Sequence, residues 1–167
     1  RRKTNQEWKK ILNKESRGRF PANSVLIPRA IRTTGRSYLS RNPVFVSTNF
    51  VVCSLPSLEM AIMMSTWMST IFYQLICEVS SKDQEGMRKM EVSDIEKTYV
   101  PKFDSISRET IDALSEECDA IEFLNLGRPQ IREVDRIWAR ELFGDNADGL
   151  LNKAQRMLEY LANRRNP

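Results

Sequence analysis

Hydrophobic and polar residues follow two different patterns on either side of residue 56. Before it, short runs rich in β-branched and aromatic residues, at 24–30 (SVLIPRA) and 44–55 (VFVSTNFVVCSL), predict strands. Pro28 marks a strand edge or a strand end, and the polar triplet at 47–49 predicts one bent strand or two strands with a break. After residue 56, apolar residues recur at steps of three and four, which is typical of helices.

The longest helical pattern spans residues 57–79, with apolar side chains at 60, 63, 64, 67, 68, 71, 72, 75 and 76. Ser57 stands where an N-cap is expected. The stretch is long enough to cross a bilayer, but it contains Glu59, Gln74, Glu78 and five Ser or Thr residues. We therefore expect one long buried helix that packs on a small twisted sheet, and no membrane partner.

The rest of the pattern completes an α+β fold. Residues 80–86 predict a loop, 87–92 a strand, and 92–101 a turn or one helical turn followed by a short strand. Helices are expected at 105–124, 129–144 and 145–166, as a C-terminal hairpin or bundle. The predicted organisation is a basic N-terminal segment (1–24) continuing from a larger parent chain, an α+β domain (25–103) and a helical region (104–167).

Charge is distributed unevenly along the chain. Residues 1–41 hold 12 Lys or Arg and two acids, whereas the remaining residues hold 14 Lys or Arg and 20 acids. The first part therefore carries +10 and the second −6, which predicts an anionic partner for the first part. Nucleic acid is the commonest such partner. The basic segment also contains a possible short amphipathic helix around Trp8, ended by Gly18 and Pro21.

The sequence lacks the residues that several kinds of catalysis and metal binding require. The chain has no histidine, no P-loop and no GxGxxG motif, and Cys53, Cys77 and Cys118 are too few and too widely spaced for a zinc site. We expect the cysteines to pack in the core of a protein in a reducing, cytoplasmic compartment. Asp94, Glu96 and Lys97 could form a magnesium-dependent nuclease cluster, but the strands at 25–55 offer no further acid. This remains the weaker alternative.

Arginine and hydroxyl side chains are concentrated between residues 29 and 42. The planar guanidinium pairs with phosphate and with guanine, and short hydroxyl groups bond phosphate and sugar oxygens. Residues 88 and 89, both basic, follow Gly86 and are expected to project from a sheet edge toward phosphate. The predicted DNA-binding residues are Arg29, Arg32, Thr33, Thr34, Arg36, Ser37, Tyr38, Arg41, Arg88 and Lys89.

The order of motifs over residues 24–102 is similar to a known module. A strand ending in LIPRAIR, the β stretch VFVSTNFVVC and a long helix precede GMRKMEVSDIEKTYVP. This resembles the target recognition domain of restriction-modification N6-adenine DNA methyltransferases and type IIG enzymes, to which type I specificity-subunit domains are related. The positions that match the family's motif are Gly86, Arg88, Lys89, Val92, Ser93, Asp94, Ile95 and Pro101, whereas MMSTWMST (63–70) departs from its Leu-Asn-Ser helix.

The resemblance implies a domain that recognises a DNA sequence and clamps double-stranded DNA while a methyltransferase or endonuclease catalytic domain acts, in cis or in trans. The Asn/Asp-Pro-Pro-aromatic motif and the glycine-rich cofactor loop of that catalytic domain do not occur here. S-adenosylmethionine is therefore expected only in a separate catalytic domain, and this chain is not expected to be catalytic by itself. The rival hypothesis is a protein-interaction or scaffold subunit that docks a partner through the acidic helices after residue 104.

Overall fold

The computed structural model describes residues 16–31, 37–80, 82–84, 87–120 and 130–165. Its strands are β1 (Ser16–Phe20), β2 (Ser24–Pro28), β3 (Ala30–Ile31), β4 (Tyr38–Ser40), β5 (Val44–Ser47), β6 (Phe50–Ser54), β7 (Lys82–Gln84) and β8 (Met87–Lys89). Its helices are α2 (Leu58–Met68), α3 (Ile71–Ser80), α4 (Val92–Ile95), α5 (Arg108–Ala120), α6 (Glu133–Phe143) and α7 (Ala147–Arg165). The predicted α+β class is confirmed, and the helix predicted around Trp8 lies outside the described residues.

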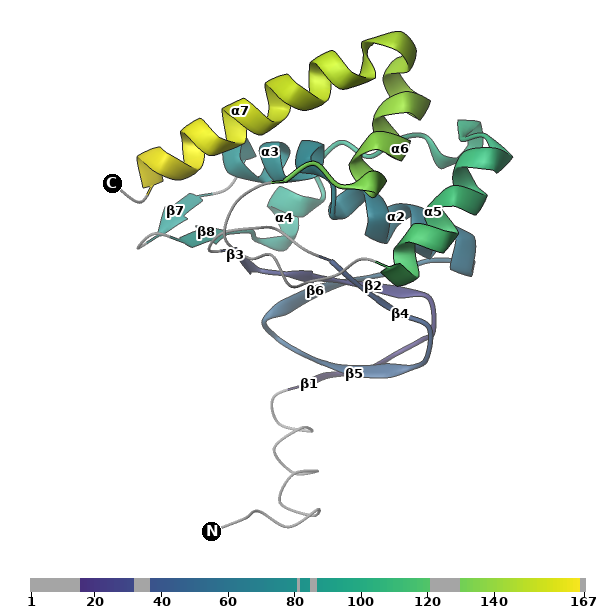
Figure 1. Cartoon of the computed structure of the whole chain (residues 1–167). Coiled ribbons are helices and arrows are strands. Elements are labelled where there is room, and N and C mark those ends of the chain that lie inside the picture. The colour runs from purple at the N-terminus through teal and green to yellow at the C-terminus, as the bar shows by residue number, and fades with distance from the viewer. Residues whose placement is uncertain (1–15, 32–36, 81, 85–86, 121–129, 166–167) are drawn as a thin grey trace.

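The described strands form three small sheets where one was expected. β2 is the middle strand of a sheet in the order β4-β2-β6, β8 is the middle strand of β3-β8-β7, and β1 pairs with β5 as a two-stranded ribbon. Every pairing is antiparallel. Figure 1 shows the helices on one side of the β2 sheet and the β1–β5 ribbon on the other.

The prediction of one helix over 57–79 is wrong. The stretch forms two helices, α2 and α3, and the chain bends by 65° between them. The hydroxyl of Thr70 accepts the N–H of Tyr73 at 3.2 Å and so caps the start of α3. The N–H of Ile71 donates to Oδ1 of Asp135 at 2.6 Å, across 64 positions of sequence. These acceptors satisfy N–H groups at the start of the new helix. No single described helix is long and apolar enough to span a membrane.

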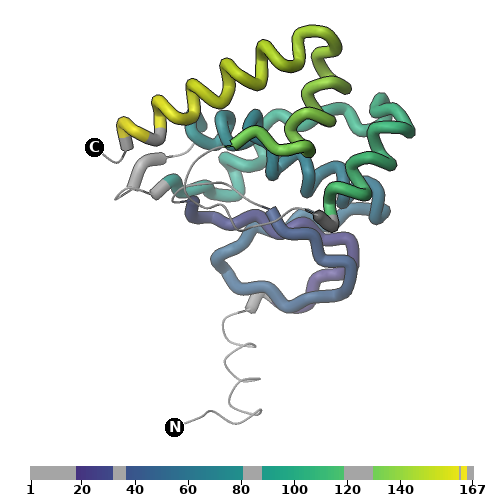
Figure 2. Tube along the Cα trace, in the orientation of Figure 1, coloured from purple at the N-terminus to yellow at the C-terminus, as the bar shows by residue number. Residues whose placement is uncertain are grey.

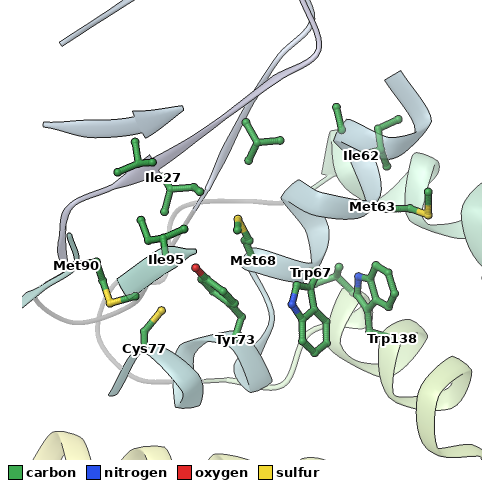
Figure 3. Close-up of a cluster of buried hydrophobic side chains, with 14 of the residues drawn as sticks. Ile27, Ile62, Met63, Trp67, Met68, Tyr73, Cys77, Met90, Ile95 and Trp138 are labelled. Atoms are coloured by element: carbon green, nitrogen blue, oxygen red, sulfur yellow. The ribbon is translucent and has the colours of Figure 1, made fainter. Parts of the chain in front are cut away.

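One buried cluster joins the sheet to helices from both halves of the chain. Val25 of β2, Trp67 of α2, Leu114 of α5 and Trp138 of α6 all belong to it. Figure 3 shows the two tryptophans together below Met63 and beside Tyr73. The boundary placed between residues 103 and 104 therefore separates a strand-containing part from a helical part, while the core continues across it.

Three strands occupy stretches that were not expected to be strands. β7 lies within the loop expected at 80–86, β4 lies within the arginine- and hydroxyl-rich stretch at 29–42, and β1 lies at the end of the basic segment, where only chain-breaking residues were noted. All three strands are short, and each depends on a partner strand for its hydrogen bonds. The strand expected at 87–92 ends at Lys89, because α4 begins at Val92, and the short strand expected before Pro101 does not form among the described residues.

The cysteines are free thiols. Cys77 is buried in the core, and burial raises the pKa of its thiol to about 12. Burial also raises the pKa of the half-buried Cys53. A protonated thiol is a poor nucleophile and a poor metal ligand, so Cys77 acts as a packing residue.

Glu141 of α6 holds the start of α5 and gives a pH-dependent prediction. It accepts the N–H and hydroxyl of Ser107 at 2.9 and 2.8 Å and the hydroxyl of Thr110 at 2.6 Å. Desolvation raises the pKa of Glu141, but these hydrogen bonds together outweigh it and hold the pKa below its ordinary value. A depressed folded-state pKa contributes stability above the unfolded-state pKa, and this contribution is lost as the pH falls through the folded-state value.

We therefore expect Glu141→Gln to lower the free energy of unfolding by less than about 1 kcal/mol at neutral pH, since the site is mostly solvated. The difference from the wild type should be smaller at about pH 3, below the ordinary pKa of a glutamate, because the contribution is lost as the pH falls toward and through the lower folded-state pKa. Urea unfolding at the two pH values measures it. A difference of the same size at both would contradict the assignment.

Candidate nucleic-acid interface

Three distant segments of the chain meet at one end of β2. Arg29 follows β2 directly, and its N–H donates to the carbonyl of Asn49 at 2.9 Å, while its carbonyl accepts the N–H of Met90 at 2.8 Å. Tyr38, at the start of β4, packs edge-on against Phe50 with ring centroids 6.0 Å apart. The predicted residues Arg29, Tyr38 and Lys89 therefore lie around this end of the sheet.

The carboxylate of Glu91 holds two of the predicted DNA-binding cations. The guanidinium of Arg29 donates through Nη2 to Oε2 of Glu91, and Nζ of Lys89 lies 3.5 Å from Oε1. The buried Met90 lies between Lys89 and Glu91 in the sequence, so these two side chains both point away from the core. Nε of Arg29 is buried and has no hydrogen-bond partner in the described part of the chain.

Arg88 and Lys89 do not lie at a sheet edge as expected, because β8 is the middle strand of its sheet, and Arg88 lies in the interior. Its Nε donates to Oε2 of Glu78 at 3.0 Å, and the two side chains are only 15% and 7% exposed. This ion pair ties β8 to α3. The contact of Arg88 with phosphate stays a prediction, and it requires the ion pair to open.

Ser37 is buried, and its hydroxyl donates to the carbonyl of Ser65 at 2.7 Å. It also lies 3.3 Å from the hydroxyl of Ser69, so it fastens the start of β4 to α2. This position suits a residue that anchors β4 to the helices better than one that contacts DNA itself. The predicted residues Arg32, Thr33, Thr34 and Arg36 lie outside the described residues, and their contacts stay predictions.

Arg41 lies at the opposite end of β2 from Arg29. It is exposed and follows β4, whose last residue, Ser40, pairs with Ser24 at the start of β2. The chain then continues into β5, which leads back toward the turn at 48–49. Figure 2 traces this return path on the side of the molecule opposite α7. Of the described predicted arginines, Arg29 and Arg41 therefore lie at opposite ends of β2 and do not form one compact cluster.

The ribbon carries exposed residues that the sequence analysis did not identify. Arg19 of β1 is exposed and lies opposite Phe45 of β5, which is 53% exposed. The neighbouring Val46 is buried, so Phe45 points outward from the strand. The period-two alternation in VFVS could have indicated an outward phenylalanine, but only the pairing with β1 places an arginine beside it.

The quarter of the chain that builds β1 to β6 contains no acidic residue. Residues 16–58 hold six arginines and neither Asp nor Glu, whereas 20 of the 22 acids follow residue 58. On α5, Glu109, Asp112 and Glu116 are exposed. The side of the molecule formed by β1 to β6, the β side, therefore presents positive charge. The side formed by α5 to α7, the helical side, presents much of the negative charge. A surface of one sign attracts a polyanion and orients it before contact.

Asp94 has a structural role at the start of α4. Its Oδ2 accepts the N–H of Glu91 at 3.0 Å and closes the first turn of α4. No group of three or more Cys, Asp or Glu side chains among the described residues is placed to hold a metal ion. The arrangement around Asp94 therefore favours capping over the nuclease alternative.

The domain is an α+β fold in which strands β1 to β6 carry no acidic residue and the β2 sheet packs on helices. Such a charge distribution suits a domain that binds an anionic partner. The family model described as the specificity domain of the restriction endonuclease BpuSI matches residues 1–131. The crystal structure of the type IIG restriction endonuclease BpuSI matches with a TM-score of 0.83 and 36% sequence identity, over 99% of this chain and 19% of that chain. No curated protein matches the sequence.

The chain belongs to the BpuSI specificity-domain family. The resemblance inferred from the motif at 85–101 is confirmed, and the likeness extends beyond residues 24–102 into the C-terminal helices. The chain corresponds to 19% of the length of the endonuclease that it matches.

Proposed function

We propose that this chain is the module of a restriction-modification enzyme that recognises a specific DNA sequence and clamps the duplex. The observation that carries the proposal is the match to a restriction endonuclease specificity domain over residues 1–131. The charge distribution supports it, because residues 16–58 combine six arginines with no acid. Basic side chains neutralise phosphates and release counterions, which makes binding strong at low salt and weak at high salt.

The two ends of β2 would then serve as phosphate contacts on either side of the ribbon. Arg29 and Lys89 lie at one end, and Arg41 lies at the other. Contacts with the phosphates fix the register of a protein on the duplex, and sequence is read from the base edges between them. The predicted residues Arg32 and Arg36 come between Arg29 and Arg41 in the sequence and lie outside the described residues.

The catalytic step is proposed to reside in a methyltransferase or endonuclease domain linked to this chain in cis or in trans. The motifs that hold S-adenosylmethionine in such domains are absent from this sequence, so its residues do not fit that cofactor. We place the whole enzyme in the cytoplasm. On α7, Met157 and Tyr160 are 50% and 57% exposed, and this helix lies on the side opposite the ribbon. That position favours α7 as a contact with the catalytic domain.

The test is selection from a library of random duplexes at two salt concentrations, followed by sequencing of the DNA that the purified chain retains. We expect salt-dependent binding and enrichment of a short motif. Salt-dependent binding without enrichment would show that the chain clamps DNA without reading it. Absence of binding at low salt would contradict the proposal and favour the protein-interaction hypothesis.

Substitution of Glu91 tests the role of the cations that it neutralises. Glu91→Gln removes the negative charge beside Arg29 and Lys89, so both cations become available to phosphate. We expect the affinity for a random duplex to rise several-fold at low salt, with a salt slope steeper by about one to two. Fluorescence anisotropy over a salt series measures both quantities.

Glu96→Gln is the matched control, since Glu96 is exposed and forms no ion pair with a described residue. Both variants change the net charge by the same amount. An equal gain in affinity from the two would show that overall charge, and not release of Arg29 and Lys89, controls binding.

A further inference from the structure

The outer face of the β1–β5 ribbon presents an arginine and a phenylalanine side by side. Arg19 lies directly opposite Phe45 in the antiparallel register, and residues directly opposed on two strands project from the same face. Phe45 is 53% exposed, although the next residue along β5, Val46, is 3% exposed. An apolar ring is therefore held in solvent next to a cation, in the middle of a strand.

We propose that this ribbon enters the major groove of the recognised DNA and that Arg19 and Phe45 read base pairs there, an inference that rests on the proposed function. A two-stranded ribbon fits the major groove, which is about 12 Å wide. The guanidinium fork of arginine pairs with O6 and N7 of guanine, and the ring of phenylalanine packs on the methyl group of thymine. The two exposed side chains thus have the chemistry needed to read two different base pairs.

The local backbone supports this use of the ribbon. The register shifts between Ser16 and Arg19, and Gly18 between them has a φ of +101°, where a residue with a side chain would be strained. Such a bulge bends a strand and changes the direction of the side chains that follow it. Arg19 is the first residue after the bulge, so the bulge determines the direction of its guanidinium.

Groups suited to phosphate and sugar lie at both ends of the ribbon. Thr48 and Asn49 are exposed in the turn after β5, and Arg41 and Asn42 are exposed in the turn before it. The whole segment lacks acids that would repel the DNA backbone. The ribbon has apolar and basic groups on its outer face and polar groups at its ends. In a DNA groove, the base edges likewise lie between two phosphate backbones, so the face could contact bases while the ends contact phosphates.

The spacing predicts a property of the recognised sequence. Directly opposed side chains start about 5 Å apart, and successive base pairs are about 3.4 Å apart. Arg19 and Phe45 would therefore contact adjacent or next-but-one base pairs. The motif recovered by selection should contain a G·C pair and an A·T pair within about two positions of each other.

The experiment repeats the random-duplex selection with Arg19→Lys, Arg19→Ala and Phe45→Ala beside the wild type. Arg19→Lys keeps the charge but loses the planar fork, so binding to random DNA should remain while the guanine preference falls about 5- to 100-fold. Phe45→Ala should lose the preference at the neighbouring A·T pair and keep the salt dependence. Arg140→Ala on α6 and Tyr99→Ala after α4 are matched controls, since both side chains are exposed and lie outside the ribbon.

The outcomes separate this inference from the proposed function. If the wild type enriches a motif and the Arg19 and Phe45 variants enrich the same motif equally, the inference is overturned and the proposed function stands. If the wild type binds no DNA, the proposed function fails first. Loss of each preference at its own base pair, with unchanged motifs from the Arg140 and Tyr99 controls and unchanged thermal unfolding, is the expected result.

Discussion

Replacement of Trp138 by alanine is expected to lower the free energy of unfolding by about 3–5 kcal/mol, as for other large buried aromatic residues. Trp138 is fully buried on α6, and its indole N–H donates to the hydroxyl of the equally buried Thr66 at 3.1 Å. Its ring meets Trp67 edge-on at 5.6 Å and lies 6.4 Å from Phe103. The substitution removes packing that joins the helical part to the part containing the sheets.

Urea unfolding followed by far-UV circular dichroism and by fluorescence of the remaining tryptophans measures this loss. Because one core crosses both parts of the chain, a single transition is expected with both probes. Trp138→Phe is the control, since it keeps an aromatic ring and loses mainly the hydrogen bond. A loss of less than about 1 kcal/mol for the alanine variant, or a separate early transition of the helices, would contradict a shared core.

Replacement of Asp135 by alanine has the second largest expected effect. It should lower the free energy of unfolding by about 2–4 kcal/mol, because buried N–H donors lose their acceptor. Asp135 is fully buried and accepts the N–H of Ile71 at 2.6 Å and that of Arg132 at 2.8 Å. The side chain of Arg132 in turn donates to the carbonyl of Ser69, in the bend between α2 and α3. Burial raises the pKa of this carboxyl, whereas the charge of Arg132 and the two N–H groups act to lower it.

Asp135→Asn is the conservative comparison, because the amide oxygen still accepts one of the two N–H groups. We expect the asparagine variant to lose less stability than the alanine variant in the same urea experiment. Equal losses would show that the charge, and not the hydrogen-bonding geometry, holds the bend. No loss in either variant would contradict the account of why the helix breaks at that point.

The elements that the sequence could predict are those with a local cause. The alternation around 44–55 gives β5 and β6, and the steps of three and four after residue 105 give α5, α6 and α7. The bend between α2 and α3 escaped prediction because the apolar period continues through it, and its acceptor, Asp135, lies 64 positions away. β1 escaped prediction for a similar reason, since its partner strand β5 comes after three other strands.

The candidate site was predictable in composition and less so in arrangement. The arginine-rich segment and the motif with Lys89 identified the class of partner, and the family match agrees with it. The sequence did not show that Arg88 pairs with Glu78, or that Glu91 lies between Arg29 and Lys89. Such ion pairs join residues of different strands and helices. Before the fold is known, the sequence does not show which charged side chains are paired within the protein and which are exposed.

The central claim is that the acid-free β side of this chain meets DNA while the helical side does not. Hydrogen–deuterium exchange with and without a duplex at low salt tests it most directly. The account predicts that DNA slows exchange in β1, β5 and the turns that flank β5, and leaves α5 and α7 unchanged. Protection confined to α5, α6 and α7, or no protection in any part of the chain, would contradict it.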